Sequence, residues 1–190
     1  MSELKRTFKQ AIQTFTHASD FIVPLYEDAY LIAEDLSDEI AAERNFNEQD
    51  YDAQLLIENE MEGAVAFFGK LAAAFLIIQV SLLEDCLLEI CETAAQTGNI
   101  PFHTNPDQPF TAERAKQFFE RQLGTQFPEP WPAWEKVQEV QKRRDQVVRH
   151  GSLDEGPGII SDSFLVDVNE TMVKFLEELQ GYLLPKSDAL

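Results

Sequence analysis

One short stretch of this chain carries residue types suited to moving a proton beside a fixed positive charge. Arg144 and Asp145 are followed by His150, at the end of a helix predicted from about Pro132 to Arg149. Arg144 lies near the middle of the apolar side of that helix, and an unpaired buried cation is costly. We therefore expect it to be paired, used in a site, or both. The apolar residues span an arc of roughly 140°: Trp134, Val137, Val140, Val147 and Val148.

The spacing within this stretch limits how its residues can cooperate. Histidine has a pKa near 6.5 and can move a proton at neutral pH, while arginine keeps its positive charge. Six residues along a helix correspond to about 9 Å of rise and about 240° of rotation. Arg144 and His150 of one chain would not reach the same atom if the helix ran straight. They can meet if His150 sits in a turn that folds back, or if two chains pool their residues.

Each of these residues also has a purely structural interpretation. Arg144 is a candidate for a buried ion pair, and Glu84, the lone acid on a mostly apolar stretch, is its expected partner. His150 suits the C-terminal end of a helix, where a positive charge is favourable. Asp145 and Arg149 are four residues apart, a spacing that permits an ordinary helical ion pair.

The composition indicates one acidic domain with a substantial core. The chain has 190 residues, of which 44% are hydrophobic, and a net charge of −19. Residues 1–100 hold 5 basic and 19 acidic residues, while residues 101–190 hold 10 and 15. This acidity argues against a general polyanion-binding surface, but a local basic group can still bind one or two phosphates. Lys142, Arg143 and Arg149 form such a group around Arg144.

Nearly every long segment of the sequence has a helical pattern. Ser2 can cap a first helix to about Phe21, and Pro24 is expected to break or kink it. The remaining predicted helices run from about Leu25 to Ala42, Tyr51 to Gln96, Thr111 to Leu123, Pro132 to Arg149, and Asp167 or Asn169 to Leu184. Residues 159–166 are predicted as a short extended piece. The expected fold is an all-α bundle of about five or six helices in a single domain.

Several other site types and locations are disfavoured. There is no Gly-rich phosphate loop, CxxC pair or HExxH motif, and we expect no metal site and no cofactor. Cys86 and Cys91 are expected to be buried free thiols, as in a reducing cytoplasm. The first residues do not resemble a secretory signal. Residues 64–83 form the one candidate membrane span, but Lys70 and Gln79 interrupt it, so we expect a buried central helix and a cytoplasmic protein.

The stretch from Arg143 to Gly151 resembles the HEPN superfamily, helical proteins that include many ribonuclease toxins. That motif has an arginine, a polar neighbour, and a histidine four to six residues after the arginine. Arg144, Asp145 and His150 match these positions, one residue longer than the commonest spacing, which would place the histidine at Arg149. The element Ser81-Leu82-Leu83-Glu84 resembles the family's Ser-x-x-Glu helix. The resemblance covers residues 65–184, and residues 1–60 look like an N-terminal helical extension.

The resemblance implies a metal-independent endoribonuclease in which the ribose 2′-OH attacks the adjacent phosphate. Arg144, His150 and Asp145 would form the catalytic group, Lys142, Arg143 and Arg149 would bind RNA, and Glu84 would support Arg144. It also implies a homodimer with a shared cleft, a role as a toxin or defence effector, and an antitoxin-like partner. Two alternatives remain open: a non-catalytic dimer that binds nucleotide, RNA or protein, and an acidic bundle that binds a basic partner.

Overall fold

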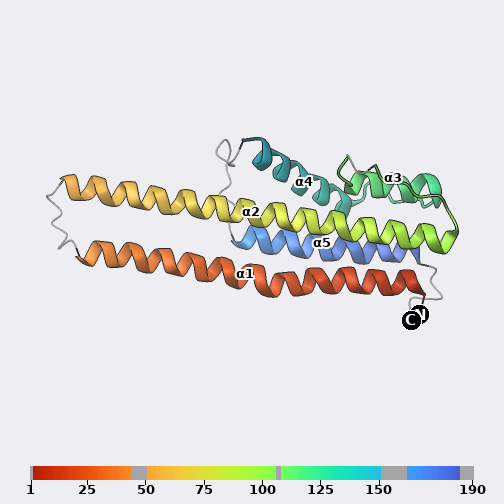
Figure 1. The fold of residues 1–190 in the computed structure, drawn as a ribbon, viewed down its shortest axis with the longest axis horizontal. Coiled ribbons are helices and arrows are strands. Elements are labelled where there is room, and N and C mark those ends of the chain that lie inside the picture. Colours follow the sequence, from red (N-terminus) through yellow and green to blue (C-terminus); the bar gives the residue numbers. More distant parts are fainter. Residues whose placement is uncertain (1, 44–50, 106–107, 151–161, 185–190) are drawn as a thin grey trace.

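The chain folds into an all-α bundle, as predicted. A computed structural model describes residues 2–43, 51–105, 108–150 and 162–184; within these ranges, the side chains of most residues from 18 to 66, and those of residues 68, 150, 162 and 163, are outside the description. The described residues form five helices and no strand (Figure 1). These helices are α1 (Glu3–Glu43), α2 (Tyr51–Gly98), α3 (Ala112–Gln122), α4 (Pro132–His150) and α5 (Asp162–Leu183).

The first helix is longer than the sequence predicted. Ser2 caps it, accepting a bond from the Lys5 backbone N–H, but α1 then continues through Pro24 to Glu43 as one helix. The prediction of two helices separated at Pro24 was therefore wrong. Pro24 is exposed, so water can hydrogen-bond the backbone carbonyl that loses its N–H partner there.

The C-terminal half of α2 forms the centre of the bundle. This helix packs against α1, α3, α4 and α5, and Leu76, Leu83 and Leu87 are fully buried. A stripe that includes Ile78 and Asp85 remains exposed. The predicted central helix, closed near Gly98, is confirmed. The segment Gly69–Gly98 is long and apolar enough to span a membrane, yet 56% of its most apolar stretch is buried inside the bundle, as in a core helix.

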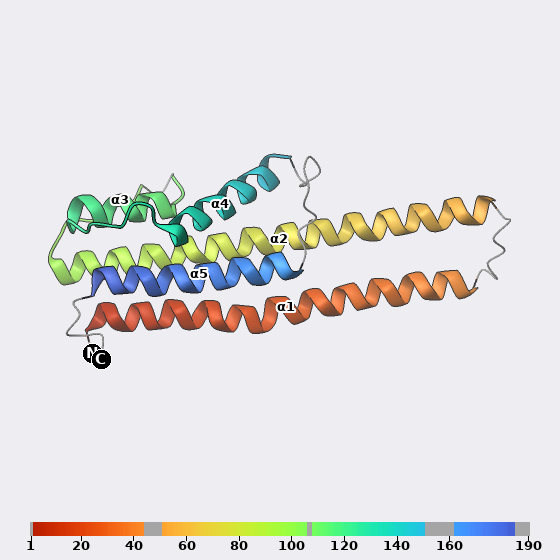
Figure 2. The same cartoon turned by 180° about the vertical axis from the view of Figure 1, so that it is seen from behind.

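The two long helices also form a hairpin that projects beyond the rest of the bundle. In Figures 1 and 2, the second half of α1 and the first half of α2 extend past α3, α4 and α5. The first half of α1 belongs to the core, because Phe8 and Phe15 are fully buried. In the projecting part, residues 27–43 and 51–69 hold 11 acidic residues and no basic one, so more than half of the net charge of −19 is carried there.

The shorter helices are set by local caps and by aromatic packing. Thr111 accepts a bond from the Arg114 backbone N–H and caps α3, and Gly124 adopts a φ of 66° after the helix ends, as predicted. Trp131 then anchors the start of α4: it stacks on Phe127, and its indole N–H donates to Glu178 of α5 at 2.6 Å. This anchor determines where α4 begins.

The last helix begins earlier than expected. α5 starts at Asp162, so residues 162–166 are helical rather than extended, and Asp167 and Asn169 lie inside the helix instead of capping it. Its packing explains the difference, because Leu165 is buried one turn before the predicted start. The predicted core face is otherwise confirmed: Met172, Phe175, Leu176 and Leu179 are buried, and Leu183 is half-buried.

Two glycine substitutions should shift stability in opposite directions. Gly124→Ala should lower the free energy of unfolding by about 1 kcal/mol, because an alanine is strained at a φ of 66° although no atom crowds its Cβ. Gly69→Ala, inside α2 with nothing within 4 Å of an added Cβ, should raise it by about 0.5–1 kcal/mol. Urea denaturation measures both. Shifts in the same direction would contradict this explanation.

Candidate functional site

Arg144 forms an ion pair across the interface between α2 and α4. Its Nη2 donates to Glu84 Oε1 at 3.2 Å, and its Nη1 donates to Glu84 Oε2 at 3.4 Å. The Arg144 side chain is 18% exposed and that of Glu84 is 9% exposed. The expected partner of Arg144 is therefore confirmed. Two parallel bonds orient the plane of the guanidinium group more firmly than a single contact would.

A third residue, which sequence reasoning missed, holds the same carboxylate. Gln141 donates from Nε2 to Glu84 Oε1 at 3.2 Å. Gln141 and Arg144 are three residues apart and so lie on the same face of α4. That spacing, together with the lone acid on the apolar helix α2, was the sequence signal that could have indicated Gln141 as a second partner of Glu84. Because glutamine is a neutral donor, it orients Glu84 without competing with Arg144 for its charge.

Asp145 contacts the other edge of the guanidinium group. Its Oδ1 lies 2.8 Å from Arg144 Nε, yet the Nε–H does not point at this oxygen and makes no hydrogen bond. The contact is therefore an ion pair held by charge and proximity alone. The expected alternative, an Asp145–Arg149 pair, is not among the ion pairs of the described residues, where Asp145 pairs with Arg144 instead.

The burial of Glu84 raises the pKa of its carboxyl group. Loss of solvation is the largest cause and outweighs the opposing effect of the Arg144 charge and of the hydrogen bonds from Arg144 and Gln141. Asp145 adds a smaller contribution in the raising direction. The attraction between Glu84 and Arg144 therefore mainly offsets the free energy lost when the two charges are desolvated, and it adds little net stability, as is usual for buried ion pairs.

The predicted RNA-binding residues occupy different environments. Lys142 and Arg149 are exposed. Arg143 is not a free cation: its Nη2 lies 3.1 Å from Glu139 Oε1, and its guanidinium carbon lies 4.6 Å from the centre of the Phe164 ring. Its side chain is nevertheless 40% exposed, so part of the group can still reach an anion.

His150 is the last residue of α4, which agrees with its predicted place at the helix end. Its side chain, Gly151 and the Gly-rich segment that follows lie outside the described residues. Whether Arg144 and His150 meet, in one chain or across two, therefore stays a prediction.

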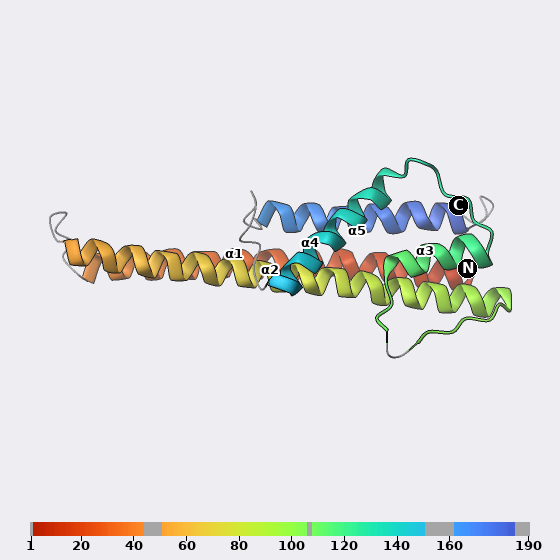
Figure 3. The ribbon, with the colours of Figure 1, turned by 90° about the horizontal axis from the view of Figure 1, so that it is seen from above.

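The apolar side of α4 is confirmed at four of its five predicted positions. Trp134, Val137, Val140 and Val147 are buried, whereas Val148 is 62% exposed. The prediction was wrong for Val148 because it assumed a helix packed along its full length. Figures 1 and 2 show that the C-terminal end of α4 stands off from α2, and Figure 3 shows α4 crossing the bundle obliquely. The end of α4 is thus left with an exposed apolar residue.

Neither cysteine is placed to act as a nucleophile. Both are free and buried, as predicted. Burial raises the pKa of the Cys86 thiol to about 11 and raises the pKa of Cys91 further still, so both remain protonated at neutral pH.

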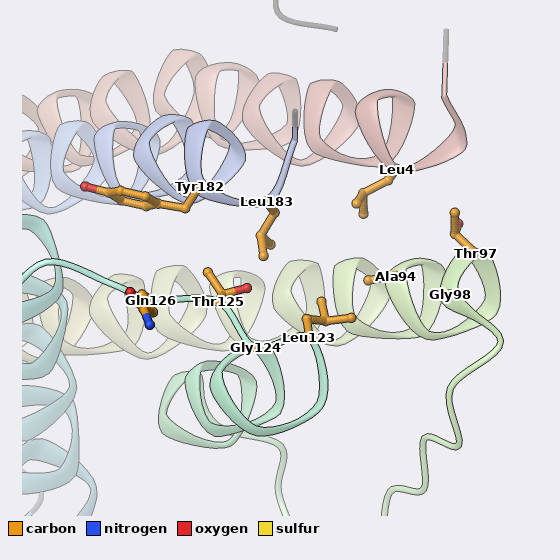
Figure 4. A pocket seen from close by; sticks show the side chains of 10 residues that line it. All are labelled: Leu4, Ala94, Thr97, Gly98, Leu123, Gly124, Thr125, Gln126, Tyr182 and Leu183. Atoms are coloured by element: carbon orange, nitrogen blue, oxygen red, sulfur yellow. The ribbon is translucent and has the colours of Figure 1, made fainter. Parts of the chain in front are cut away.

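A cavity of about 630 Å³ lies between the first turn of α1, the ends of α2 and α5, and the turn after α3 (Figure 4). Its lining includes Leu4, Thr97, Gly124 and Tyr182, and none of the described residues that line it is charged. Gly98, which also lines it, lies fourteen residues beyond Glu84, or roughly 21 Å along α2. The cavity is therefore separate from the Arg144 site.

Comparisons of the chain with protein-family models, with curated proteins and with solved structures found no match.

Removing Arg144 should leave Glu84 as an unpaired buried carboxylate, and the resulting loss in the free energy of unfolding should depend on pH. We expect Arg144→Leu to lower the free energy of unfolding by about 3 kcal/mol at pH 7. Without Arg144, the pKa of Glu84 in the folded state should rise further above its unfolded value of about 4.3. Folded protein then binds more protons than unfolded protein over a wider range, so the loss should be smallest near pH 4.5 and grow as the pH rises.

Urea denaturation at several pH values would measure this loss. Lys136→Leu removes an exposed cation from the same helix and should cost less than about 0.5 kcal/mol at every pH. The double variant Glu84→Leu/Arg144→Leu should remove the pH-dependent part. A constant loss across the pH range in Arg144→Leu would show that Glu84 is not the group responsible.

Proposed function

We propose that this protein is a metal-independent endoribonuclease of the HEPN type that acts as a homodimer. The observation that carries the proposal is the arrangement of Arg144. Its guanidinium group is oriented by buried Glu84, keeps some exposure to solvent, and lies six residues before the histidine that ends α4. The motif residues are thus a fixed cation and a terminal histidine, rather than scattered surface charges.

The chemistry requires one group to move a proton and another to stabilise charge. As the ribose 2′-oxygen forms a bond to phosphorus, the bond from phosphorus to the 5′-oxygen breaks, leaving a 2′,3′-cyclic phosphate and a 5′-hydroxyl. His150 takes the proton from the 2′-OH and returns it to the departing 5′-oxygen, and Arg144 stabilises the negative charge that develops on the phosphate oxygens. Lys142, Arg143 and Arg149 contact neighbouring phosphates.

Helix geometry supports the proposed homodimer. Both Arg144 and His150 belong to α4, and about 240° of rotation separates them within one chain. A second copy, with its own α4 facing the first, can bring His150 close to the Arg144 of its neighbour. The exposed Val148, on the part of α4 that stands off from α2, supplies apolar surface for such a contact.

The charge distribution favours a restricted RNA-binding surface. The acidic residues of the projecting hairpin repel a polyanion, while the basic group on α4 attracts it locally. We further propose that the protein works in the cytoplasm as a toxin or a defence effector and is neutralised by an antitoxin-like protein partner.

One observation favours a second candidate function. Glu84 and Asp145 together place two negative charges against the single positive charge of Arg144, which weakens its attraction for phosphate. A non-catalytic dimer of the same architecture, binding nucleotide, RNA or a protein, would be consistent with that balance.

Cleavage of RNA without metal distinguishes the two candidates. The purified protein should cut total RNA in the presence of EDTA and leave 2′,3′-cyclic phosphate ends. His150→Ala should lower the rate by at least about 100-fold, since proton transfer by a positioned side chain contributes roughly that much. His103→Ala, at an exposed loop histidine, should leave the rate unchanged. Intact RNA under all conditions would exclude the nuclease and leave the binding function.

The shared site predicts that two inactive variants rescue each other. Light scattering should give a mass of twice the 21.6 kDa of one chain. His150→Ala and Arg144→Lys should each be inactive alone. If each site takes its arginine from one chain and its histidine from the other, a mixed dimer contains one intact site, so an equal mixture should recover roughly a quarter of the activity. A monomer, or no recovery on mixing, would rule out the shared site.

A further inference from the structure

The guanidinium group of Arg144 is held differently at its two ends. Its terminal nitrogens, Nη1 and Nη2, bind the two oxygens of Glu84. Its Nε edge faces Asp145. An arginine can bind a phosphate through two parallel N–H groups on either of these faces. Because Glu84 occupies the terminal face, the Nε edge is the one left for an anion; with Asp145 in its present position the Nε atom is buried and makes no hydrogen bond.

The two carboxylates are unequally fixed. Glu84 is 9% exposed and accepts hydrogen bonds from both Arg144 and Gln141. Asp145 is 53% exposed, and the Arg144 Nε–H makes no hydrogen bond to it although the two atoms are 2.8 Å apart. Glu84 cannot leave without exposing a buried cation, whereas Asp145 can turn into solvent at little cost. Only Asp145 is therefore a displaceable ligand of the guanidinium group.

We propose that Asp145 is an electrostatic gate on a phosphate-binding edge of Arg144, formed by Nε and the adjacent terminal nitrogen. With Asp145 in place, Arg144 and its two carboxylates carry one net negative charge, and an anion is repelled. When Asp145 turns away, the local charge is zero and the Nε edge is open to two phosphate oxygens. The identity of the anion as an RNA phosphate rests on the proposed function; the gate itself rests on the contacts above.

The gate differs from the role that the motif resemblance implies for this position. If the polar neighbour helped Arg144 to bind phosphate, its removal would lower the affinity for phosphate. A gate predicts the opposite sign, because the aspartate and the phosphate compete for the same nitrogen. The sign of one affinity change therefore separates the two roles.

Nuclear magnetic resonance of the Arg144 Nε–H group tests the gate in the full-length protein. Inorganic phosphate, and separately a short oligoribonucleotide, would be titrated while the shift of this resonance is followed. Asp145→Asn keeps the shape of the side chain and removes its charge. We expect it to tighten phosphate binding by about fivefold to tenfold, the effect of removing one like charge at close range in a partly solvated site. Asp145→Ala should tighten it similarly.

Asp28→Asn removes the same charge from an exposed position on the projecting part of α1 and should leave the affinity within about twofold, since that charge is distant and screened. Equal or weaker phosphate binding in Asp145→Asn would overturn the gate, as would equal tightening in Asp28→Asn. Tighter binding of phosphate by Asp145→Asn, together with no cleavage of RNA by the wild type, would uphold the gate while refuting the nuclease. Cleavage of RNA by the wild type, with no tighter binding of phosphate by Asp145→Asn, would uphold the nuclease while refuting the gate.

Discussion

Burial of the C-terminal half of α2 is the constraint on which the rest of the bundle depends. This helix contacts all four of the others, so any charge on its inner faces must be neutralised inside the protein. Glu84 is such a charge: Arg144 on the facing helix neutralises it, and Gln141 donates a hydrogen bond to it. The rotation of α4 about its axis is therefore set by this carboxylate together with the buried apolar side of the helix, and this rotation also sets the direction in which the motif residues project.

The opposite end of α4 is held by a different kind of interaction. Trp131 packs among aromatic rings that include Phe127 and Phe175, and its indole N–H is bound by Glu178. A helix anchored by an aromatic cluster at its start and by an ion pair in its second half has little freedom to move as a rigid body. Only its last turns stand off from the bundle, and these turns carry His150.

The sequence predicted features that depend on local chemistry better than those that depend on packing. The Thr111 cap and the turn at Gly124 follow from residue type and local spacing, and both were predicted. The Arg144–Glu84 pair joins two helices, yet it was predicted as well, because a cation and a lone acid on apolar surfaces each need a partner of opposite charge. The continuity of α1 through Pro24 was not, because an exposed proline costs a helix less than a buried one. The early start of α5 and the exposure of Val148 depend on where neighbouring helices lie, which no single segment encodes.

The structural and functional interpretations of Arg144 are not mutually exclusive. A buried ion pair that neutralised the whole guanidinium group would leave nothing for a ligand, and the arginine would then serve only the fold. Here the buried carboxylate takes the terminal nitrogens and the exposed one lies at Nε. The same side chain can therefore compensate Glu84 and keep its Nε edge, which is buried here and makes no hydrogen bond, for a ligand that displaces Asp145. Because the contact with Glu84 orients the guanidinium group, the Nε edge is already positioned before any anion arrives, and less ordering entropy is lost on binding.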